Sequence, residues 1–291
     1  MTGSKQKKPQ SNPQRHQTSR PPVESPRPRI VQEFVVPDSC VRAMAALPTV
    51  LDEIIPLNQR HRQQLSGDIR RLWDDLTSEK QHRFAEYLGA PAFSSAYCRY
   101  FLPWNILRLS SILKDLPLSL SADATVLDFG SGPLTFPIAL YASRPDLRKT
   151  PLTLYCADKT QRILNLGKAI FESLCVRIEG ELPPWKIELV QLAFGSPLKA
   201  QAASKSMPDR TDRPDRFEKV DLLTEANMFN EFFWKGEAPL GTKAIQNTSK
   251  LLSYVKDSGK VLLVEPGEPR SGAFISAMRA ALALCGLEPI S

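Results

Sequence analysis

A short turn near the middle of the chain has the composition of a ligand-binding loop, because it combines two glycines with polar side chains: Asp128, Gly130, Ser131 and Gly132. Glycine lets the backbone turn tightly and lets a ligand approach it without an intervening side chain. The turn follows the apolar run Thr125–Phe129 and precedes a segment of helical character. Nucleotides bind at such strand-to-helix turns in parallel α/β sheets, so we predict a nucleotide site here.

Two further polar positions follow apolar runs. Asp158 comes directly after Leu152–Ala157, and a carboxylate there can accept hydrogen bonds from both hydroxyls of a ribose. Asn227 and Asn230 come shortly after Val220–Thr224, where substrate groups are held, and we include Asn227 in the predicted cofactor site. Turn formation and capping are the alternative for both asparagines. No N-P-P-[YF] tetrad or Pro-Cys nucleophile follows this run, so we name no catalytic residue.

The residue type at position 135 distinguishes between the two kinds of adenosine-containing ligand that this pattern allows. A dinucleotide-binding turn reads G-x-G-x-x-G, whereas the last position here is Thr135. The acid two residues before the first glycine, Asp128, resembles instead the first motif of class I methyltransferases, whose cofactor S-adenosylmethionine has no pyrophosphate. Asp128 could also cap the backbone of the turn with either ligand. The pattern favours S-adenosylmethionine, and a nucleotide-dependent oxidoreductase is the weaker alternative.

Strands and helices alternate over residues 119–291, which predicts a parallel sheet with helices on both faces. The expected strands are Thr125–Phe129, Leu152–Ala157, Trp185–Leu192, Val220–Thr224 and Lys260–Val264. The expected helices are Leu134–Ser143, Thr160–Arg177, Thr242–Tyr254 and Ala273–Leu284. Gly195–Glu218 interrupts the alternation with Asp-Arg-Pro repeats and predicts a mobile surface loop. The expected fold class is therefore α/β, with a Rossmann-like, mostly parallel sheet.

A helical region, residues 31–118, is expected before the sheet. Leu57–Leu76 places apolar residues at helical spacing. Ser78 has capping-box spacing, and we expect the helix that it opens to end at Gly89, with Pro91 as the stop.

Most of the net charge of +7 belongs to residues 1–30. This segment holds seven basic residues and one acid among Pro, Gln and Ser, so it has too little apolar surface to fold. It acts either as an arm attracted to RNA phosphates or as a solvated tail without a partner. Its prolines disfavour a mitochondrial transit helix, and the chain has no apolar stretch suited to a secretory signal or a membrane span. The five cysteines form no C-x-x-C pair, and we expect a cytoplasmic protein.

Four segments, in this order, resemble the methyltransferase-like family associated with the small ribosomal subunit of bacteria and mitochondria. They are Tyr100–Asn105, Val126–Pro133, Asp221–Glu231 and Leu263–Pro269. The resemblance covers about residues 95–290, and Val264–Pro269 (Val-Glu-Pro-Gly-Glu-Pro) is its most specific element. It implies binding of S-adenosylmethionine at Asp128, Gly130, Gly132 and Asp158. It also implies a role in small-subunit assembly or translation, with ribosomal RNA as the partner.

The chain departs from the family pattern in two places. Family members have a glycine where this chain has Leu134, whose side chain would either crowd the methionine end of the cofactor or pack against the sheet. They also continue into a cysteine-rich, metal-binding stretch, whereas this chain ends at Ser291. We therefore assign no metal and expect a C-terminally incomplete domain without the closing two-strand hairpin of class I methyltransferases.

Two functions remain open. The first is an S-adenosylmethionine-dependent methyltransferase that acts on ribosomal RNA or a ribosomal protein, in which positioning of the acceptor supplies much of the acceleration. The alternative is a non-catalytic, RNA-binding ribosome assembly factor that retains the fold. Leu134 and the missing C-terminal stretch favour the alternative, whereas the preserved cofactor motifs favour the enzyme.

Overall fold

The computed structural model describes residues 35–77, 87–194, 219–229 and 237–289. The helices of these residues are α1 (Asp38–Ile54), α2 (Gln59–Thr77), α3 (Pro91–Ala96), α4 (Leu102–Leu113), α5 (Thr135–Ser143), α6 (Gln161–Glu179), α7 (Leu240–Leu252) and α8 (Pro269–Leu284), with a short 3₁₀ turn η1 (Tyr87–Gly89) and a π-helical turn η2 (Tyr97–Phe101). The strands are β1 (Ala124–Phe129), β2 (Leu152–Asp158), β3 (Trp185–Gln191), β4 (Val220–Ala226) and β5 (Val255–Val264).

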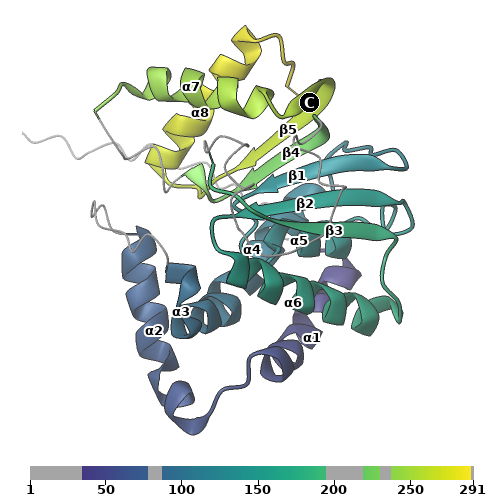
Figure 1. The fold of residues 1–291 in the computed structure, drawn as a ribbon, viewed down its shortest axis with the longest axis vertical. Coiled ribbons are helices and arrows are strands. Elements are labelled where there is room, and N and C mark those ends of the chain that lie inside the picture. Colours follow the sequence, from purple (N-terminus) through teal and green to yellow (C-terminus); the bar gives the residue numbers. More distant parts are fainter. Residues whose placement is uncertain (1–34, 78–86, 195–218, 230–236, 290–291) are drawn as a thin grey trace, which may run out of the picture. The chain divides into compact units, whose positions relative to one another are not determined.

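The five strands form one parallel sheet in the order β3-β2-β1-β4-β5 (Figure 1). The chain winds from β1 outward through β2 to β3, and then returns to the other side of β1 for β4 and β5. In the register of the sheet, Phe129 pairs with Ala157 on β2 and with Glu225 on β4. The loops that follow these strands therefore meet at one edge of the sheet, beside the switch point. This arrangement confirms the predicted α/β fold.

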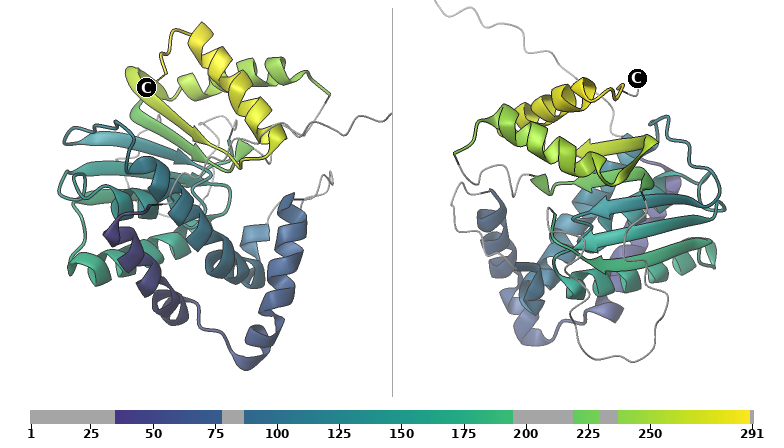
Figure 2. Two further views of the ribbon diagram at one scale, coloured as in Figure 1. Left: turned by 180° about the vertical axis from the view of Figure 1, so that it is seen from behind. Right: turned by 45° about the horizontal axis from the view of Figure 1, so that its top comes forward.

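Helices lie on both sides of the sheet (Figure 2). Alternate residues of a strand face opposite sides and so contact different helices. Val126 of β1 belongs to a core shared with α1, α4, α5 and α6. Leu127 and Phe129 belong to a second core, shared with α7 and α8. Both faces of the central strand β1 are covered by helices, so its sequence is a nearly continuous apolar run. The exception is Asp128, which is also buried.

The helices before the sheet share its core. The hydroxyl of Ser39 on α1 donates to the carbonyl oxygen of Ala142 on α5 at 2.5 Å. Arg177 of α6 pairs with Glu53 of α1 at 2.5 Å, so α1 is also connected to α6 at the surface. The apolar face of α4, which includes Ile106, is fully buried in the same core.

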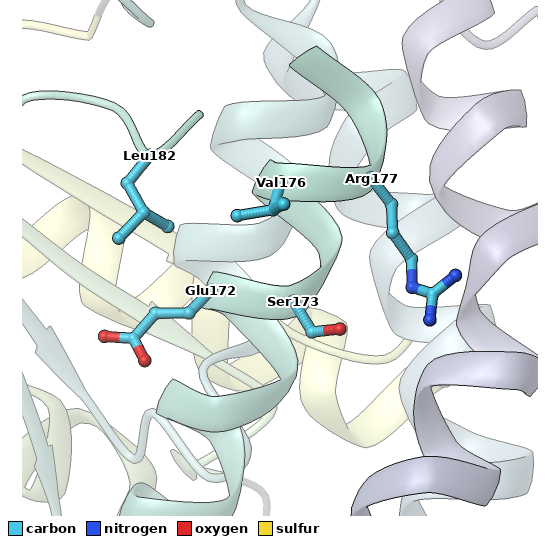
Figure 3. A pocket seen from close by; sticks show the side chains of 5 residues that line it. All are labelled: Glu172, Ser173, Val176, Arg177 and Leu182. Atoms are coloured by element: carbon cyan, nitrogen blue, oxygen red, sulfur yellow. The ribbon is translucent and has the colours of Figure 1, made fainter. Parts of the chain in front are cut away.

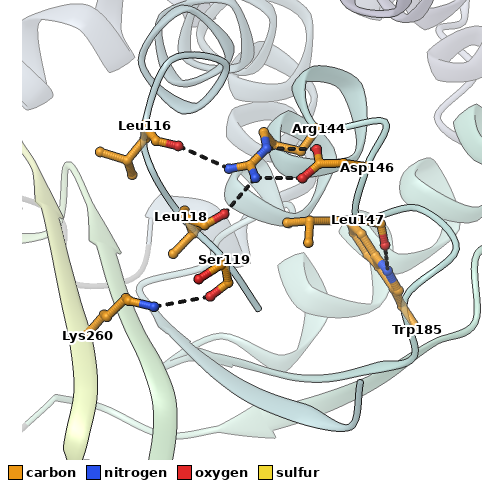
Figure 4. Close-up of polar contacts among 8 residues, drawn as sticks. All are labelled: Leu116, Leu118, Ser119, Arg144, Asp146, Leu147, Trp185 and Lys260. Carbon is orange, nitrogen blue, oxygen red and sulfur yellow. Dashed lines mark hydrogen bonds and ion pairs between the residues drawn. The ribbon is translucent and has the colours of Figure 1, made fainter. Parts of the chain in front are cut away.

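A polar cluster connects the segment between α4 and β1 to the amino-terminal side of the sheet (Figure 4). The guanidinium of Arg144 donates to the carbonyl oxygens of Leu116 and Leu118 at 3.3 and 2.6 Å, and it pairs with Asp146 at 2.6 Å. Lys260 of β5 donates to the carbonyl oxygen of Ser119 at 3.1 Å. These contacts lie at the edge opposite to the glycine turn and have a structural role.

Several boundaries differ from those predicted. The 3₁₀ turn η1 ends at Gly89, where the helix before Pro91 was expected to end, and Pro91 in addition begins α3, because proline is well tolerated in the first helical turn. The predicted helix Leu134–Ser143 begins at Thr135, since Leu134 is in the left-handed conformation. β5 begins at Val255, five residues before the predicted start. The predicted tail (residues 1–30), the helix start at Ser78 and the loop Gly195–Glu218 lie outside the described residues.

Candidate functional site

The turn after β1 is left-handed at alternate residues. The φ angles of Gly130, Gly132 and Leu134 are 66°, 53° and 57°. Glycine adopts this conformation without a steric penalty, whereas leucine does so at a cost of about 1–2 kcal/mol. The N–H of Ser131 donates to the carbonyl oxygen of Ala157 at 3.0 Å, which connects the turn to the end of β2.

Asp158, the last residue of β2, holds the turn directly. Its Oδ2 accepts the N–H of Gly132 at 3.1 Å, and its Oδ1 accepts the N–H of Thr160 at 2.9 Å. The sheet thus brings together the acid and the turn that the sequence analysis combined. Asp158 therefore joins the end of β2 to both the glycine turn and the residues that lead into α6. Among the described residues, a Cβ added to Gly132 would meet only the carbonyl oxygen of Gly130, at 3.9 Å, so these residues leave the backbone beside Asp158 uncovered.

Asp128 lies beneath the turn and is 2% exposed. Its Oδ1 accepts a hydrogen bond from the hydroxyl of Thr224 on β4 at 2.7 Å, which connects the two central strands. Burial raises the pKa of Asp128 from 3.8 to about 7, although the hydroxyls of Ser131 and Thr224 partly offset this effect. The negative charge of Asp158 raises the pKa further. The hydrogen bond to Thr224, rather than a bond to the backbone of the turn, is the contact that positions Asp128.

The side chain of Leu134 does not block the approach of a ligand to the turn. Its side chain is fully buried in the core formed with α1, α4, α5 and α6. Of the two orientations considered from the sequence, the structure therefore contains the one in which the leucine packs as a core residue. Its left-handed backbone also explains why a glycine suits this position in related turns.

Met228 is the side chain that covers the glycine turn. A Cβ added to Gly130 would lie 2.9 Å from the Cβ and 3.1 Å from the Sδ of Met228. Met228 is 8% exposed and belongs to the core on the α7 and α8 side of the sheet. A cofactor that approaches Gly130 has to displace this side chain, which methionine permits because it has three rotatable bonds. No sequence pattern pointed to Met228, because its contact with Gly130 arises from the pairing of β1 with β4.

A second pair of acids lies at the ends of β4 and β5. Oε1 of Glu225 accepts the N–H groups of Met228 and Phe229, and Oε1 of Glu265 accepts the N–H of Phe229 at 2.7 Å. Burial raises the pKa of Glu225 well above its ordinary value, and so do the charge and hydrogen bond of Glu265. The pair therefore favours one shared negative charge over two. Neither acid is among the predicted site residues, although each follows an apolar run, as Asp158 does.

A cavity of about 520 Å³ opens beside this pair. One wall consists of α4 residues between Asn105 and Ile112. The opposite wall consists of Asn227 and the segment Val264–Glu268. We name it the α4 cavity. Cavities of about 300–1,000 Å³ hold small molecules or parts of larger ones, so its size is suitable for a ligand.

The predicted site residue Asn227 lines this cavity, and the next residue, Met228, lies against the glycine turn. The φ of Asn227 is 62°, and its N–H donates to the carbonyl oxygen of Val264 at 2.8 Å. The left-handed conformation agrees with the turn-forming alternative for this asparagine, while its side chain remains available at the cavity wall. Asn230 lies outside the described residues.

Another cavity, of about 410 Å³, lies on the outer side of α6 and is lined by Glu172, Ser173, Val176, Arg177 and Leu182 (Figure 3). These side chains come from one helix and the residues just after it, away from the carboxyl ends of the strands. None of the predicted site residues lines it. We do not regard it as part of the candidate site.

The strand order, the parallel pairing and the flanking helices define a Rossmann-like, doubly wound α/β fold. Among the residues that the structure describes, no group of three or more His, Cys, Asp or Glu side chains could hold a metal ion. Within the same residues, no helix has the length and apolar character needed to cross a membrane.

Comparison with known proteins found no matching family model and no matching curated protein. Among solved structures, a precorrin-6y C5,15-methyltransferase from Geobacter metallireducens is 11% identical with a TM-score of 0.34, and the match covers 60% of this chain and 70% of that one. A phosphoethanolamine N-methyltransferase from Haemonchus contortus is 13% identical with a TM-score of 0.31, and the match covers 59% of this chain and 32% of that one. A plantazolicin methyltransferase is 10% identical with a TM-score of 0.31, over 84% of this chain and 72% of that one. Similarities this low identify neither a family nor an activity.

Proposed function

We propose that this chain is an S-adenosylmethionine-dependent methyltransferase. The observation that carries the proposal is the contact between Asp158 and the N–H of Gly132, at the carboxyl edge of β1 and β2 and beside the switch point. A nucleoside fits there, with its hydroxyls on Asp158 and its remainder along the open backbone at Gly132. The cofactor would supply an activated methyl group, and the chain would orient cofactor and acceptor.

The start of α5 favours this cofactor over a dinucleotide. A pyrophosphate binds to free N–H groups at the N-terminus of the helix after the turn. Here every residue of α5 is buried, and Thr135 at its start is only 8% exposed. The amino end of α5 therefore offers little room for two phosphates, whereas S-adenosylmethionine carries none.

The acceptor that we propose is part of the small ribosomal subunit, either ribosomal RNA or a ribosomal protein. This part of the proposal is supported by the ordered resemblance of Tyr100–Asn105, Val126–Pro133, Asp221–Glu231 and Leu263–Pro269 to the ribosome-associated family. The second candidate is an assembly factor that keeps the fold without catalysis. The position of Met228 against Gly130 favours this candidate, because the side chain covers part of the cofactor surface.

Isothermal titration of the purified protein with S-adenosylhomocysteine tests the cofactor assignment. Replacing Asp158 by alanine should weaken binding by about 1–3 kcal/mol, since it removes hydrogen bonds to a charged group. Asp257→Ala, at the amino edge of the same sheet, is the control and should bind as the wild type does. Equal affinities of the two variants, or tighter binding of NAD than of S-adenosylhomocysteine, would refute the assignment.

Replacing Met228 by alanine should strengthen binding of S-adenosylhomocysteine about tenfold, which corresponds to about 1.4 kcal/mol. The same change should lower the melting temperature, because removing a buried methionine side chain costs about 2–5 kcal/mol. Met278→Ala is the matched control, since Met278 is fully buried in the same core but does not contact Gly130. It should lose stability without gaining affinity. A similar affinity for both variants would show that Met228 does not restrict the cofactor.

A further inference from the structure

The α4 cavity has acidic side chains on one wall and a cationic side chain on the other. Glu265 and Glu268 belong to the wall formed after β5, so a phosphate group is repelled from that side. Arg108 lies on the α4 wall and is exposed, and among the described residues no hydrogen bond or ion pair occupies its guanidinium. The cavity therefore suits a ligand that has an anionic group beside the α4 wall and a neutral part beside the acidic wall.

The polar groups inside the cavity suit a planar ligand with mixed hydrogen-bonding groups. Asn105 is 8% exposed and donates through Nδ2 to the hydroxyl of Tyr97 at 3.3 Å, which leaves its carbonyl oxygen as an acceptor. Asn227 contributes a second amide from the opposite wall. An amide can donate and accept side by side, and this arrangement matches the edges of nucleobases. Leu109 adds an apolar surface to the same wall.

Exposed aromatic side chains lie next to the cavity residues in sequence, on α4 and on the π-helical turn η2 before it. Trp104 is 55% exposed and lies one turn before Arg108, and Ile112, 41% exposed, lies one turn after it. Tyr100 lies a further turn back, and it meets Trp73 of α2 edge to face at 6.5 Å. Both of these rings are partly exposed. Tryptophan at such a position provides a flat surface on which a base can stack.

We propose that the α4 cavity receives one nucleobase of single-stranded RNA, that Arg108 binds the adjoining phosphate, and that Trp104 stacks on the next base. Alternation of aromatic and cationic groups along a groove is how proteins bind single strands, whose bases are free to leave the stack. The inference rests on the proposed function, because it selects RNA over ribosomal protein as the acceptor. The acids of the opposite wall repel the phosphates, so the base rather than the backbone lies beside that wall.

Fluorescence anisotropy tests the proposal. It measures how the full chain, without cofactor, binds a labelled single-stranded RNA of about ten nucleotides. Trp104→Ala should weaken binding about 5- to 150-fold, and Trp104→Phe should restore most of it. Arg108→Gln should weaken binding and reduce the salt dependence by about one phosphate contact. Ile245→Ala on α7 and Arg279→Gln on α8 are controls of similar exposure and should bind as the wild type does.

Wild-type affinity of both Trp104→Ala and Arg108→Gln would overturn the proposal. So would equal affinity for a duplex of the same sequence, because a paired base cannot enter the cavity. If the two variants bind RNA normally but lose binding to small-subunit proteins, the surface is a protein interface and the proposal is wrong. Failure of the methyltransferase assignment would appear separately, in the titration with S-adenosylhomocysteine.

Discussion

Replacing Gly167 by alanine should destabilise the protein by about 3 kcal/mol or more. Gly167 lies within α6, where this helix crosses the glycine turn. A Cβ at this position would lie 2.3 Å from the carbonyl carbon of Pro133 and 2.7 Å from the backbone nitrogen of Leu134. Both neighbours are backbone atoms, which cannot change rotamer to make room, so the helix or the turn has to move. Chemical denaturation of the variant measures the loss of stability.

The same substitution should weaken binding of S-adenosylhomocysteine, because the displaced segment carries the N–H of Gly132 that Asp158 holds. Gly67→Ala is the matched control. Gly67 lies in α2 with no atom within 4 Å of its added Cβ, so alanine should raise stability by up to about 1 kcal/mol through helix propensity. Similar stabilities of the Gly167 variant and the wild type would contradict the close packing of α6 on the turn.

Replacing Asp128 by asparagine should make the protein more stable at pH 8, by up to about 4 kcal/mol, and leave it nearly unchanged at pH 4. The pKa of Asp128 is 3.8 in an unperturbed chain and about 7 in the fold, so the native state holds an extra proton between these values. The stabilisation from the protonated form is complete below pH 4 and is lost as the pH rises through 7. Asparagine is neutral at every pH and keeps an oxygen that can accept from Thr224.

Urea denaturation of both proteins from pH 4 to pH 8 measures this difference. The wild type should lose stability across the range, and the variant should lose less. The stability of the variant should still decrease somewhat as the pH rises. The pKa of Glu225 is raised as well, so its contribution to the pH dependence has the same sign. Asp74→Asn, on the exposed surface of α2, is the control and should follow the wild-type curve. Parallel curves for Asp128→Asn and the wild type would contradict a raised pKa at this carboxyl.

Both predictions concern residues that hold the glycine turn after β1 in place. Asp158 bonds to its backbone, α6 packs on it at Gly167, and Asp128 connects β1 to β4 beneath it. A site that holds a cofactor needs this rigidity, because its groups act only when their positions are kept within a fraction of an ångström. Met228 is the exception, since it is a flexible side chain on the same surface.

The sequence by itself determined the parallel sheet and the meeting of Asp158 with the glycine turn. Apolar runs that alternate with helical segments allow few other arrangements, because both strand faces have to be buried and the crossovers share one hand. Strand ends of a parallel sheet meet at one edge, so two residues that each follow a strand are brought close together. For the same reason the acids Glu225 and Glu265 could have been predicted.

Only the tertiary structure decided which side chains lie over, beneath and beside the turn. Leu134 packs in the core, whereas Met228 covers Gly130. Asn227 lines the α4 cavity. These outcomes depend on strand register and on the distance between α6 and the turn at Gly167, which are set by close packing of residues far apart in the chain. The spacing of residues within one segment predicts its secondary structure. The side chains that pack against that segment come from other parts of the chain, so the spacing does not predict them.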